Sequence, residues 1–199
     1  MKILILNAPP QSGKDEIAEY LSENYGAVHM EVKELLFQVA VRAAGISRPL
    51  WDALYQRDYK EVPTPYLMIN GVTVSPRQWM IHCSEKVIKP LFGKNAFGKA
   101  AVQELINRKL RPNSVVVFSD GGFREEIGSI SDFAHATDGG FYLARVHREG
   151  YDWGSDSRNW LYLDNLQGKE IDIKNEEGML AQCAEDIWDW IHKGEEDDE

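Results

Sequence analysis

Three consecutive residues near the start of the chain, Ser12, Gly13 and Lys14, carry the clearest chemical signal. An apolar run from Ile3 to Leu6 leads into them through a loop with two prolines, and an amphipathic segment follows at once. In a strand, loop and helix of this kind, the backbone N–H groups of the loop surround phosphate oxygens and the lysine reaches the β- and γ-phosphates. The pattern predicts a nucleoside triphosphate site.

Two positions depart from the phosphate-loop consensus G-x-x-x-x-G-K-[ST]. Ala8 replaces the first glycine, which is tolerable if its φ stays negative, and Asp15 replaces the hydroxyl residue that normally binds Mg²⁺. A carboxylate can also bind the metal, although its charge opposes the phosphates. We expect Gln11, Ser12, Gly13, Lys14 and Asp15 to hold the triphosphate, with Asp15 as a metal ligand. The alternative is a tight turn with a chance Gly-Lys pair.

Further polar residues follow the other predicted strands. In a parallel α/β sheet, ligands bind at the carboxyl ends of the strands. The residues at or just beyond those ends are Lys14, Lys33, Asp120, Arg148 and Asn175. Asp120 directly follows an apolar strand and is predicted to hold Mg²⁺ through water or to contact an acceptor hydroxyl. The alternative is an ordinary Asp-Gly-Gly turn.

Arginines are the second group with a chemical meaning, because phosphoryl transfer needs positive charge around the transferred group. Arg145, Arg148 and Arg158 lie in or beside a segment rich in Gly, Asp and Ser. We expect residues 148–165 to form a lid that closes over the phosphates; the alternative is a solvated loop with ordinary surface arginines. Arg77, in the first turn of a predicted helix, is a candidate for holding an acceptor phosphate or is a surface residue.

Strands and helices alternate along the chain, which predicts a parallel α/β sheet with helices on both faces. Asn70-Gly71 predicts a hairpin turn, and Ser75 to Gln78 predicts a capping box at the start of a helix. Predicted strands cover residues 2–7, 27–30, 114–119, 141–147 and 170–174, a hairpin 66–74, and helices 13–25, 32–44, 49–55, 76–90, 97–110 and 176–193.

The composition fits one α/β domain with a small insertion. The chain has 199 residues, of which 43% are hydrophobic, and its apolar runs are too short to cross a membrane. Residues 1–6 are predicted to be a strand and not a signal peptide. Cys83 and Cys183 are too far apart for a metal-type spacing or a disulfide framework, so we expect a cytoplasmic protein, in the host cytoplasm if the chain is viral.

The net charge of −10 disfavours non-specific binding to nucleic acid, which depends on neutralising phosphates. Five of the 32 acidic residues occupy positions 195–199 and are predicted to form a disordered acidic tail, so the rest of the chain carries −5. We expect a small-molecule nucleotide as the partner, with no membrane; whether the chain forms a homodimer stays open.

Several segments together resemble the bacteriophage-type deoxynucleoside monophosphate kinase family. They are SGKD at 12–15, the Lys33 helix, SPRQWMIHCSE at 75–85, SVVVFSDGGFREE at 114–126, RVHREGYDWGSDSR at 145–158 and IDIKNEE at 171–177. The resemblance implies a P-loop kinase fold with a five-stranded parallel sheet and an inserted helical substrate region. It implies a single kinase domain over residues 1–194, with the substrate region at 46–112.

The resemblance also implies site roles. Lys14 and residues 11–15 would hold ATP, Asn175 would contact the adenine, and Asp15 and Asp120 would organise Mg²⁺. Arg148 and Arg158 would close on the transition state, and Lys33, Arg77 and Arg124 would grip the acceptor phosphate. The family has an arginine two residues after the strand-end aspartate, where this chain has Gly122. Either Arg124 replaces that arginine or acceptor recognition has changed.

The first functional hypothesis is therefore ATP-dependent conversion of deoxynucleoside monophosphates to diphosphates. A second is a P-loop kinase that phosphorylates hydroxymethylpyrimidine bases within DNA, which would need a basic groove for the strand. A third is a non-catalytic module that binds a nucleotide to change shape, which Asp15 and the glycine at position 122 would permit.

Overall fold

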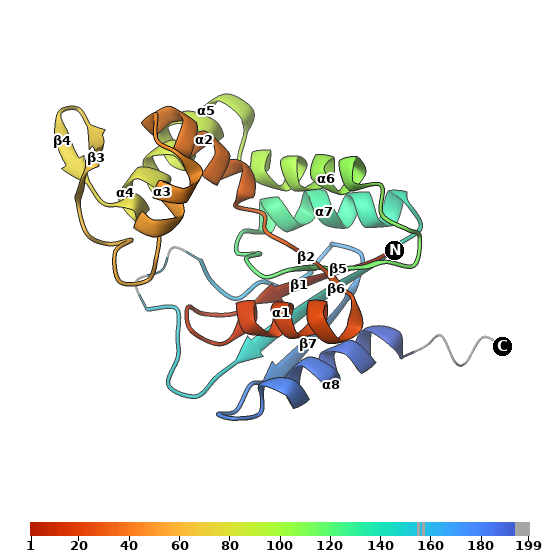
Figure 1. Cartoon of the computed structure of the whole chain (residues 1–199). Coiled ribbons are helices and arrows are strands. Elements are labelled where there is room, and N and C mark those ends of the chain that lie inside the picture. Colours follow the sequence, from red (N-terminus) through yellow and green to blue (C-terminus); the bar gives the residue numbers. More distant parts are fainter. Residues whose placement is uncertain (155, 157, 194–199) are drawn as a thin grey trace. The chain divides into compact units, whose positions relative to one another are not determined.

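The computed structural model describes residues 1–154, 156 and 158–193 of the chain (Figure 1). The predicted acidic tail at 195–199 lies outside these residues. The chain divides into two compact units: residues 1–32 with those from 98 onward, and residues 33–97. The second unit begins and ends earlier than the substrate region expected at 46–112. From Gly98 on, the helix belongs with the first unit, and a Cβ atom at Gly98 would collide with the backbone of Glu126.

The first unit is built on a five-stranded parallel sheet, as the sequence predicted. Its strands are β1 (Lys2–Asn7), β2 (Val28–Met30), β5 (Val115–Phe118), β6 (Gly140–His147) and β7 (Lys169–Lys174), in the order β2-β5-β1-β6-β7. Ile5 of β1 pairs with Phe118 of β5 on one side and with Leu143 of β6 on the other. The strand that leads into the phosphate loop is therefore central, and three-layer packing buries it on both faces.

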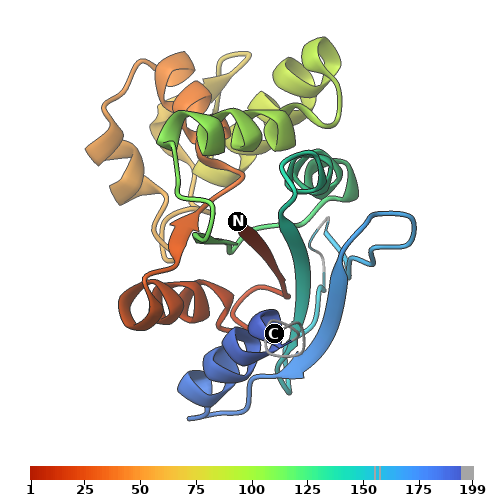
Figure 2. The same ribbon diagram turned by 90° about the vertical axis from the view of Figure 1, so that its right-hand side faces the viewer.

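Helices cover both faces of this sheet (Figures 1 and 2). α1 (Lys14–Tyr25) and α8 (Leu180–His192) pack on one face, and α6 (Ala96–Arg108) and α7 (Arg124–Ala136) on the other. Alternate residues of β1 point to opposite faces of the sheet. Leu4 and Leu6 belong to the hydrophobic core formed with α1 and α8, whereas Ile5 lies beside Gly121 and Ile127 of α7. This alternation follows from the two-residue period of a strand.

The sequence reading missed α7. The helix has no side-chain N-cap and contains glycine, serine and aspartate, which weaken helix propensity. Its signal is the helical spacing of Ile127, Ile130 and Ala134, all buried against the sheet. Tertiary packing therefore stabilises a segment whose composition resembles a loop.

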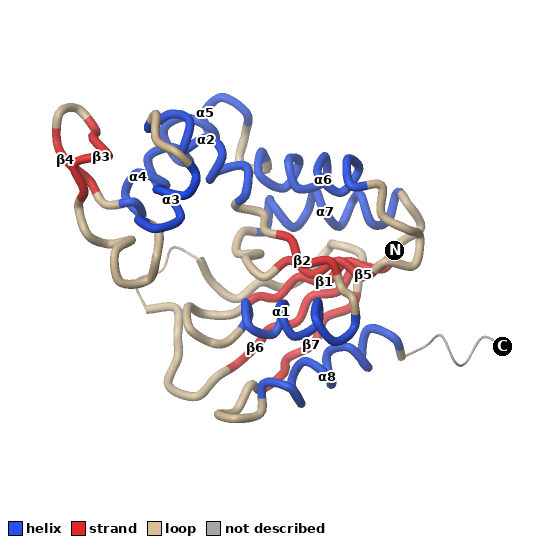
Figure 3. The backbone as a smooth tube through the Cα atoms, in the orientation of Figure 1, coloured by secondary structure: helices blue, strands red, loops and turns tan. Residues whose placement is uncertain are grey.

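The second unit holds the remaining elements (Figure 3). They are α2 (Glu34–Ala44), α3 (Arg48–Leu54), β3 (Thr64–Ile69), β4 (Val72–Val74), α4 (Pro76–His82), a π-helical turn (Cys83–Ile88) and α5 (Lys89–Phe92). Its core gathers around Trp51, which is fully buried, stacks with Tyr55 and meets Phe37 edge to face. Large aromatic side chains supply much of the buried apolar area in so small a unit.

Local signals predicted the turns of this unit correctly. Asn70 and Gly71 have φ angles of 51° and 79°, as the hairpin turn requires. Ser75 and Gln78 form the predicted capping box, with Gln78 N–H donating to Ser75 Oγ at 3.2 Å and Ser75 N–H donating to Gln78 Oε1 at 2.9 Å. Within the described residues, no helix has the length and apolar character needed to cross a membrane.

Candidate functional site

The phosphate loop runs from the end of β1 to the start of α1. Gln11 has a φ of 68° and Gly13 a φ of 89°, whereas Ala8 is buried without a positive φ, as its replacement of glycine requires. Left-handed residues in such loops turn successive amides toward a common anion. Gly13 N-caps α1 with no side-chain hydrogen bond, so the first N–H groups and the positive end of the helix dipole face the loop.

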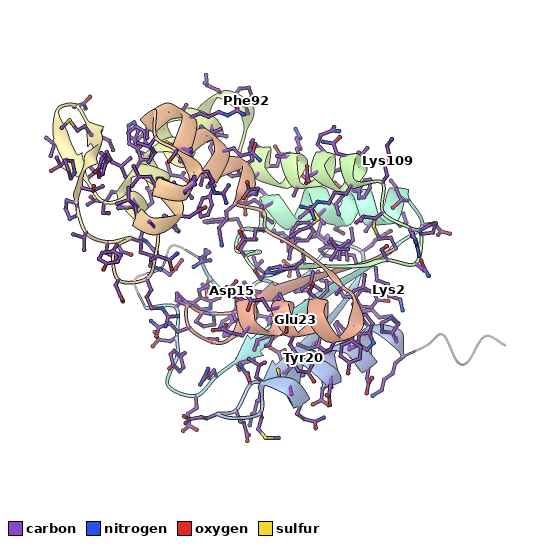
Figure 4. The ribbon with its side chains drawn as sticks, viewed as in Figure 1. Lys2, Asp15, Tyr20, Glu23, Phe92 and Lys109 are labelled. Atoms are coloured by element: carbon purple, nitrogen blue, oxygen red, sulfur yellow. The ribbon has the colours of Figure 1, made fainter. Side chains whose placement is uncertain are left out.

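Lys14 and Asp15 begin α1, and Figure 4 labels Asp15 at that end of the helix. The Lys14 side chain is 11% exposed, and its Nζ lies 3.8 Å from Asp15 Oδ2. The Asp15 side chain is 52% exposed, so it stands at the rim while Lys14 is held within the protein. Among the residues that the structure describes, the buried Ser12 Oγ finds no hydrogen-bond partner. This arrangement leaves a polar group inside the loop that a phosphate oxygen would satisfy.

Asn175 contacts the phosphate loop through its side chain. It directly follows β7 and is buried; its backbone N–H donates to the His147 carbonyl at 2.8 Å, and its Nδ2 donates to the Ser12 carbonyl at 2.8 Å. The amide also occupies the space that a Cβ atom at Gly13 would need. The structure thus gives Asn175 a loop contact that the sequence did not suggest, and the adenine contact stays a prediction.

Asp120 lies beyond β5, the strand that neighbours β1. Its Oδ1 accepts a hydrogen bond from the Val32 N–H at 2.7 Å, which fixes the carboxylate beside the end of β2. The preceding residue, Ser119, is fully buried, and its Oγ lies 2.9 Å from His29 Nε2. Asp120 is therefore at the carboxyl edge of the sheet, where the sequence placed it.

Arg145, the first of the three arginines noted in the sequence, precedes the segment expected to form a lid. It lies in β6 and its side chain is only 5% exposed, paired with Glu170 at 2.9 Å and Asp172 at 2.6 Å. Its Nη1 also donates to the Leu161 carbonyl at 3.1 Å. Hydrogen bonds from Arg145 hold the pKa of Asp172 well below its usual range. The positive charge of Arg145 is thus paired with the carboxylates of Glu170 and Asp172.

The segment expected to act as a lid is anchored in its second half. Arg124 donates to the carbonyls of Tyr162 and Leu163 at 2.6 and 3.1 Å and pairs with Asp164 at 3.0 Å. The Leu163 N–H donates to Glu170 Oε2 at 2.9 Å. These bonds tie residues 161–164 to α7, β6 and β7. Arg124 has these partners in the structure, and its contact with an acceptor phosphate stays a prediction.

Arg148 begins the segment and Arg158 lies just past its middle; residues 155 and 157 lie outside the described part. The Arg148 guanidinium lies 5.2 Å from the Tyr151 ring centroid. Arg158 pairs with Asp156 through two hydrogen bonds, Nε to Oδ1 at 2.8 Å and Nη2 to Oδ2 at 2.7 Å. The Arg158 side chain lies directly over Gly122. Their roles in the transition state stay predictions.

Lys33 and Arg77 belong to the second unit. Lys33 precedes α2, and its Nζ lies 5.7 Å from the Phe37 ring centroid. Arg77 is in the first turn of α4, where its Nε lies 3.5 Å from Glu61 Oε1 and its N–H donates to the Lys60 carbonyl at 2.9 Å. Both residues lie at helix starts, as expected, and their acceptor contacts stay predictions.

A magnesium ion fits the chemistry of this site. Among the described residues, no group of three or more His, Cys, Asp or Glu side chains is arranged to hold a metal. Mg²⁺ bound with a nucleotide needs only one or two carboxylates, because phosphate oxygens and water complete its shell. Asp15 and Asp120 would supply those carboxylates, and the metal would neutralise charge on the phosphates.

Sequence reasoning missed Asn7, which is fully buried at the end of β1. Its Oδ1 accepts from the Leu161 N–H at 3.0 Å, and its Nδ2 donates to the carbonyls of Gly121 and Asn159 at 3.2 and 3.3 Å. The available signal was a polar residue that closes an apolar strand immediately before the phosphate loop.

No family model and no curated protein matches this sequence. Several solved structures are similar to it. A dephospho-CoA kinase from Campylobacter jejuni is 12% identical, with 98% of this chain and 99% of that chain covered and a TM-score of 0.49. A shikimate kinase from Acinetobacter baumannii in complex with shikimate is 12% identical, with 98% and 94% covered and a TM-score of 0.46. A gluconokinase from Sinorhizobium meliloti 1021 is 12% identical, with 95% and 97% covered and a TM-score of 0.39. None of these likenesses is evidence about this chain's substrate.

Proposed function

We propose that this chain is an ATP-dependent phosphotransferase that converts deoxynucleoside monophosphates to diphosphates with Mg²⁺. The observation that carries the proposal is Lys14 at the start of α1, directly after a loop in which Gln11 and Gly13 are left-handed. A lysine, loop amides and a helix N-terminus together form a site suited to a chain of phosphates. The unpartnered Ser12 Oγ supports the same reading.

The carboxyl edge of the sheet supplies the remaining groups on the donor side. Asp120 follows β5, next to the strand that feeds the loop, and Arg148 follows β6 on the other side of β1. Phosphoryl transfer is catalysed mainly by positioning and by charge stabilisation, so a lysine, an arginine and a metal-holding carboxylate are a sufficient set.

The most specific part of the proposal is the acceptor, a deoxynucleoside monophosphate. It rests on the resemblance of residues 75–85 and 114–126 to the phage-type kinases and on two cations at helix starts of the second unit, Lys33 and Arg77. A cation near a helix N-terminus suits the phosphate of a free nucleotide. The net charge of −10 disfavours the basic groove that non-specific binding of a DNA strand would need.

ATP turnover against a panel of acceptors tests the proposal. The panel holds the four deoxynucleoside monophosphates, their hydroxymethylated forms and hydroxymethyl-containing DNA. We expect turnover on at least one free monophosphate, and a loss of about 100-fold or more in Lys14→Ala, because a charge contact to the transferred group is removed. Lys99→Ala, at an exposed position of α6, is the matched control and should leave turnover unchanged.

Each other result has a definite meaning. Turnover on DNA alone would favour the hydroxymethylpyrimidine kinase. Binding of ATP–Mg²⁺ without turnover on any acceptor would favour the non-catalytic module. Failure to bind ATP–Mg²⁺ in a calorimeter would overturn the proposal as a whole.

A further inference from the structure

Asn7 connects three segments that are far apart in the sequence. Its side chain is fully buried and makes three hydrogen bonds: one to the turn after β5 at Gly121, and two to the loop after β6 at Asn159 and Leu161. A side-chain amide is the neutral group that can donate two hydrogen bonds and accept a third. The end of β1, which begins the phosphate loop, is thereby fastened to the loop that carries Arg158.

Gly122 provides the space for that arginine. A Cβ atom at this position would collide with the Arg158 Cδ atom and would lie 2.9 Å from its Cγ atom. Gly122 has no positive φ, so the backbone itself does not require glycine. What requires glycine here is the aliphatic part of Arg158, which lies across the turn after β5.

Asp156 sets the direction of the guanidinium. Its side chain is only 3% exposed and holds Arg158 through both carboxylate oxygens, and the Arg158 N–H donates to Oδ1 at 3.0 Å. A bidentate pair of this kind fixes both the position and the plane of the guanidinium. With Asn159 and Leu161 bound to Asn7 immediately afterwards, Arg158 has little freedom to swing.

We propose that Asn7 is a positioning residue that fixes Arg158 at the carboxyl edge of β5, beside the strand leading into the phosphate loop. Arg158 would then stabilise the transferred phosphoryl group from a preset position, without closure of residues 159–163. Gly122 is the second requirement, because it admits the arginine side chain. This inference rests on the proposed phosphotransferase function, since it assigns a role within that reaction.

Asn7→Asp is the sharpest test, because the side chain keeps its shape while both donor contacts are lost. The carboxylate would face the carbonyls of Gly121 and Asn159 in a buried site. We expect kcat to fall about 10- to 100-fold, with the KM for ATP within about 3-fold of wild type. In an Arg158→Ala background, the same change should cost less than about 3-fold, since the group it positions is absent. Asn24→Asp, at an exposed asparagine of α1, is the matched control and should leave kcat unchanged.

Gly122→Ala gives an independent test if Asn7→Asp does not fold. The added methyl group should lower kcat when Arg158 is present and have little effect in Arg158→Ala, where the space is empty. Additive losses in both double mutants would overturn the proposal, because the residues would then act separately.

Hydrogen exchange separates this inference from the proposed function. Exchange of the Leu161 amide, which donates to Asn7, can be followed without any substrate. Faster exchange in Asn7→Ala, which removes the acceptor of this bond, supports the anchoring even if wild type shows no turnover, a result that would overturn only the proposed reaction. Unchanged exchange would overturn the anchoring.

Discussion

Replacing Asn175 by alanine should weaken triphosphate binding through the loop and not through the base. The side chain donates from Nδ2 to the Ser12 carbonyl, and both residues are almost fully buried. Without this donor, the Ser12 carbonyl loses a hydrogen bond at a position with little access to water. Leaving a buried acceptor unpaired costs about 1–3 kcal/mol.

This cost is divided between folding and binding. If the loop keeps its shape in the free protein, the free energy of unfolding falls by the whole amount. If the free loop relaxes so that water reaches the Ser12 carbonyl, the cost appears when a triphosphate forces the loop back into shape. In that limit the dissociation constant rises about 5- to 150-fold, since 1.4 kcal/mol corresponds to a factor of ten.

The assay is calorimetric titration with ATP, GTP and inorganic tripolyphosphate, each with Mg²⁺, together with urea unfolding. We expect all three ligands to weaken by the same factor, because the support acts on the phosphate loop. Asn24→Ala is the matched control: Asn24 also donates from Nδ2 to a backbone carbonyl, that of Tyr20 at 2.9 Å, but at an exposed site. Its binding constants should not change.

Two results would refute this reasoning. Weakening confined to ATP would mean that Asn175 contacts the adenine, as the resemblance implies, and that the Ser12 bond is incidental. Wild-type binding of tripolyphosphate combined with wild-type stability would mean that the hydrogen bond contributes nothing measurable.

Three further outcomes are expected. Asp172→Asn should lower the free energy of unfolding by about 1 kcal/mol at pH 7, since the carboxylate is about half exposed and partly screened. Because Arg145 holds the pKa of Asp172 below its unfolded value of about 3.9, the pair stabilises the protein above that pH, and the difference between variant and wild type should shrink as urea titrations move below about pH 4. Cys83 and Cys183 should react with a chromogenic disulfide at pH 8 only after unfolding, because burial raises the pKa of both thiols to about 11; fast labelling of the native protein would contradict this. Ser75→Ala should cost about 1 kcal/mol of stability in thermal melts by removing the cap of α4, while an unchanged melting temperature would show that the cap contributes little.

The sequence alone correctly predicted the structural features whose stabilising contacts join residues close together in the chain. The strand, loop and helix around Lys14, the left-handed Asn70-Gly71 turn and the capping box at Ser75 each depend on residues within a few positions of one another. Alternating strands and helices also predicted the parallel sheet. The helix Arg124–Ala136 was missed because its stability comes from packing against the sheet, which no local propensity records.

The contacts of the candidate site depend far more on the tertiary structure than the turns and helix starts do. Asp120 and Arg148 follow β5 and β6, the two strands that neighbour β1, and therefore flank the phosphate loop. The sequence predicts the strands but not their order in the sheet. The contact of Asn175 with Ser12 spans 163 positions and that of Asn7 with Leu161 spans 154. Arg145 shows the converse, since its position among other arginines suggested phosphate binding whereas its partners on β7 neutralise it.

The sequence by itself determined the chemistry that the first strand and helix can offer, because a phosphate loop is built from one short stretch of backbone. Only the tertiary structure decided which side chains hold that loop and the arginine segment in place. The physical reason is that a buried polar group must find its partner wherever the fold brings one within about 3 Å, at any separation along the chain.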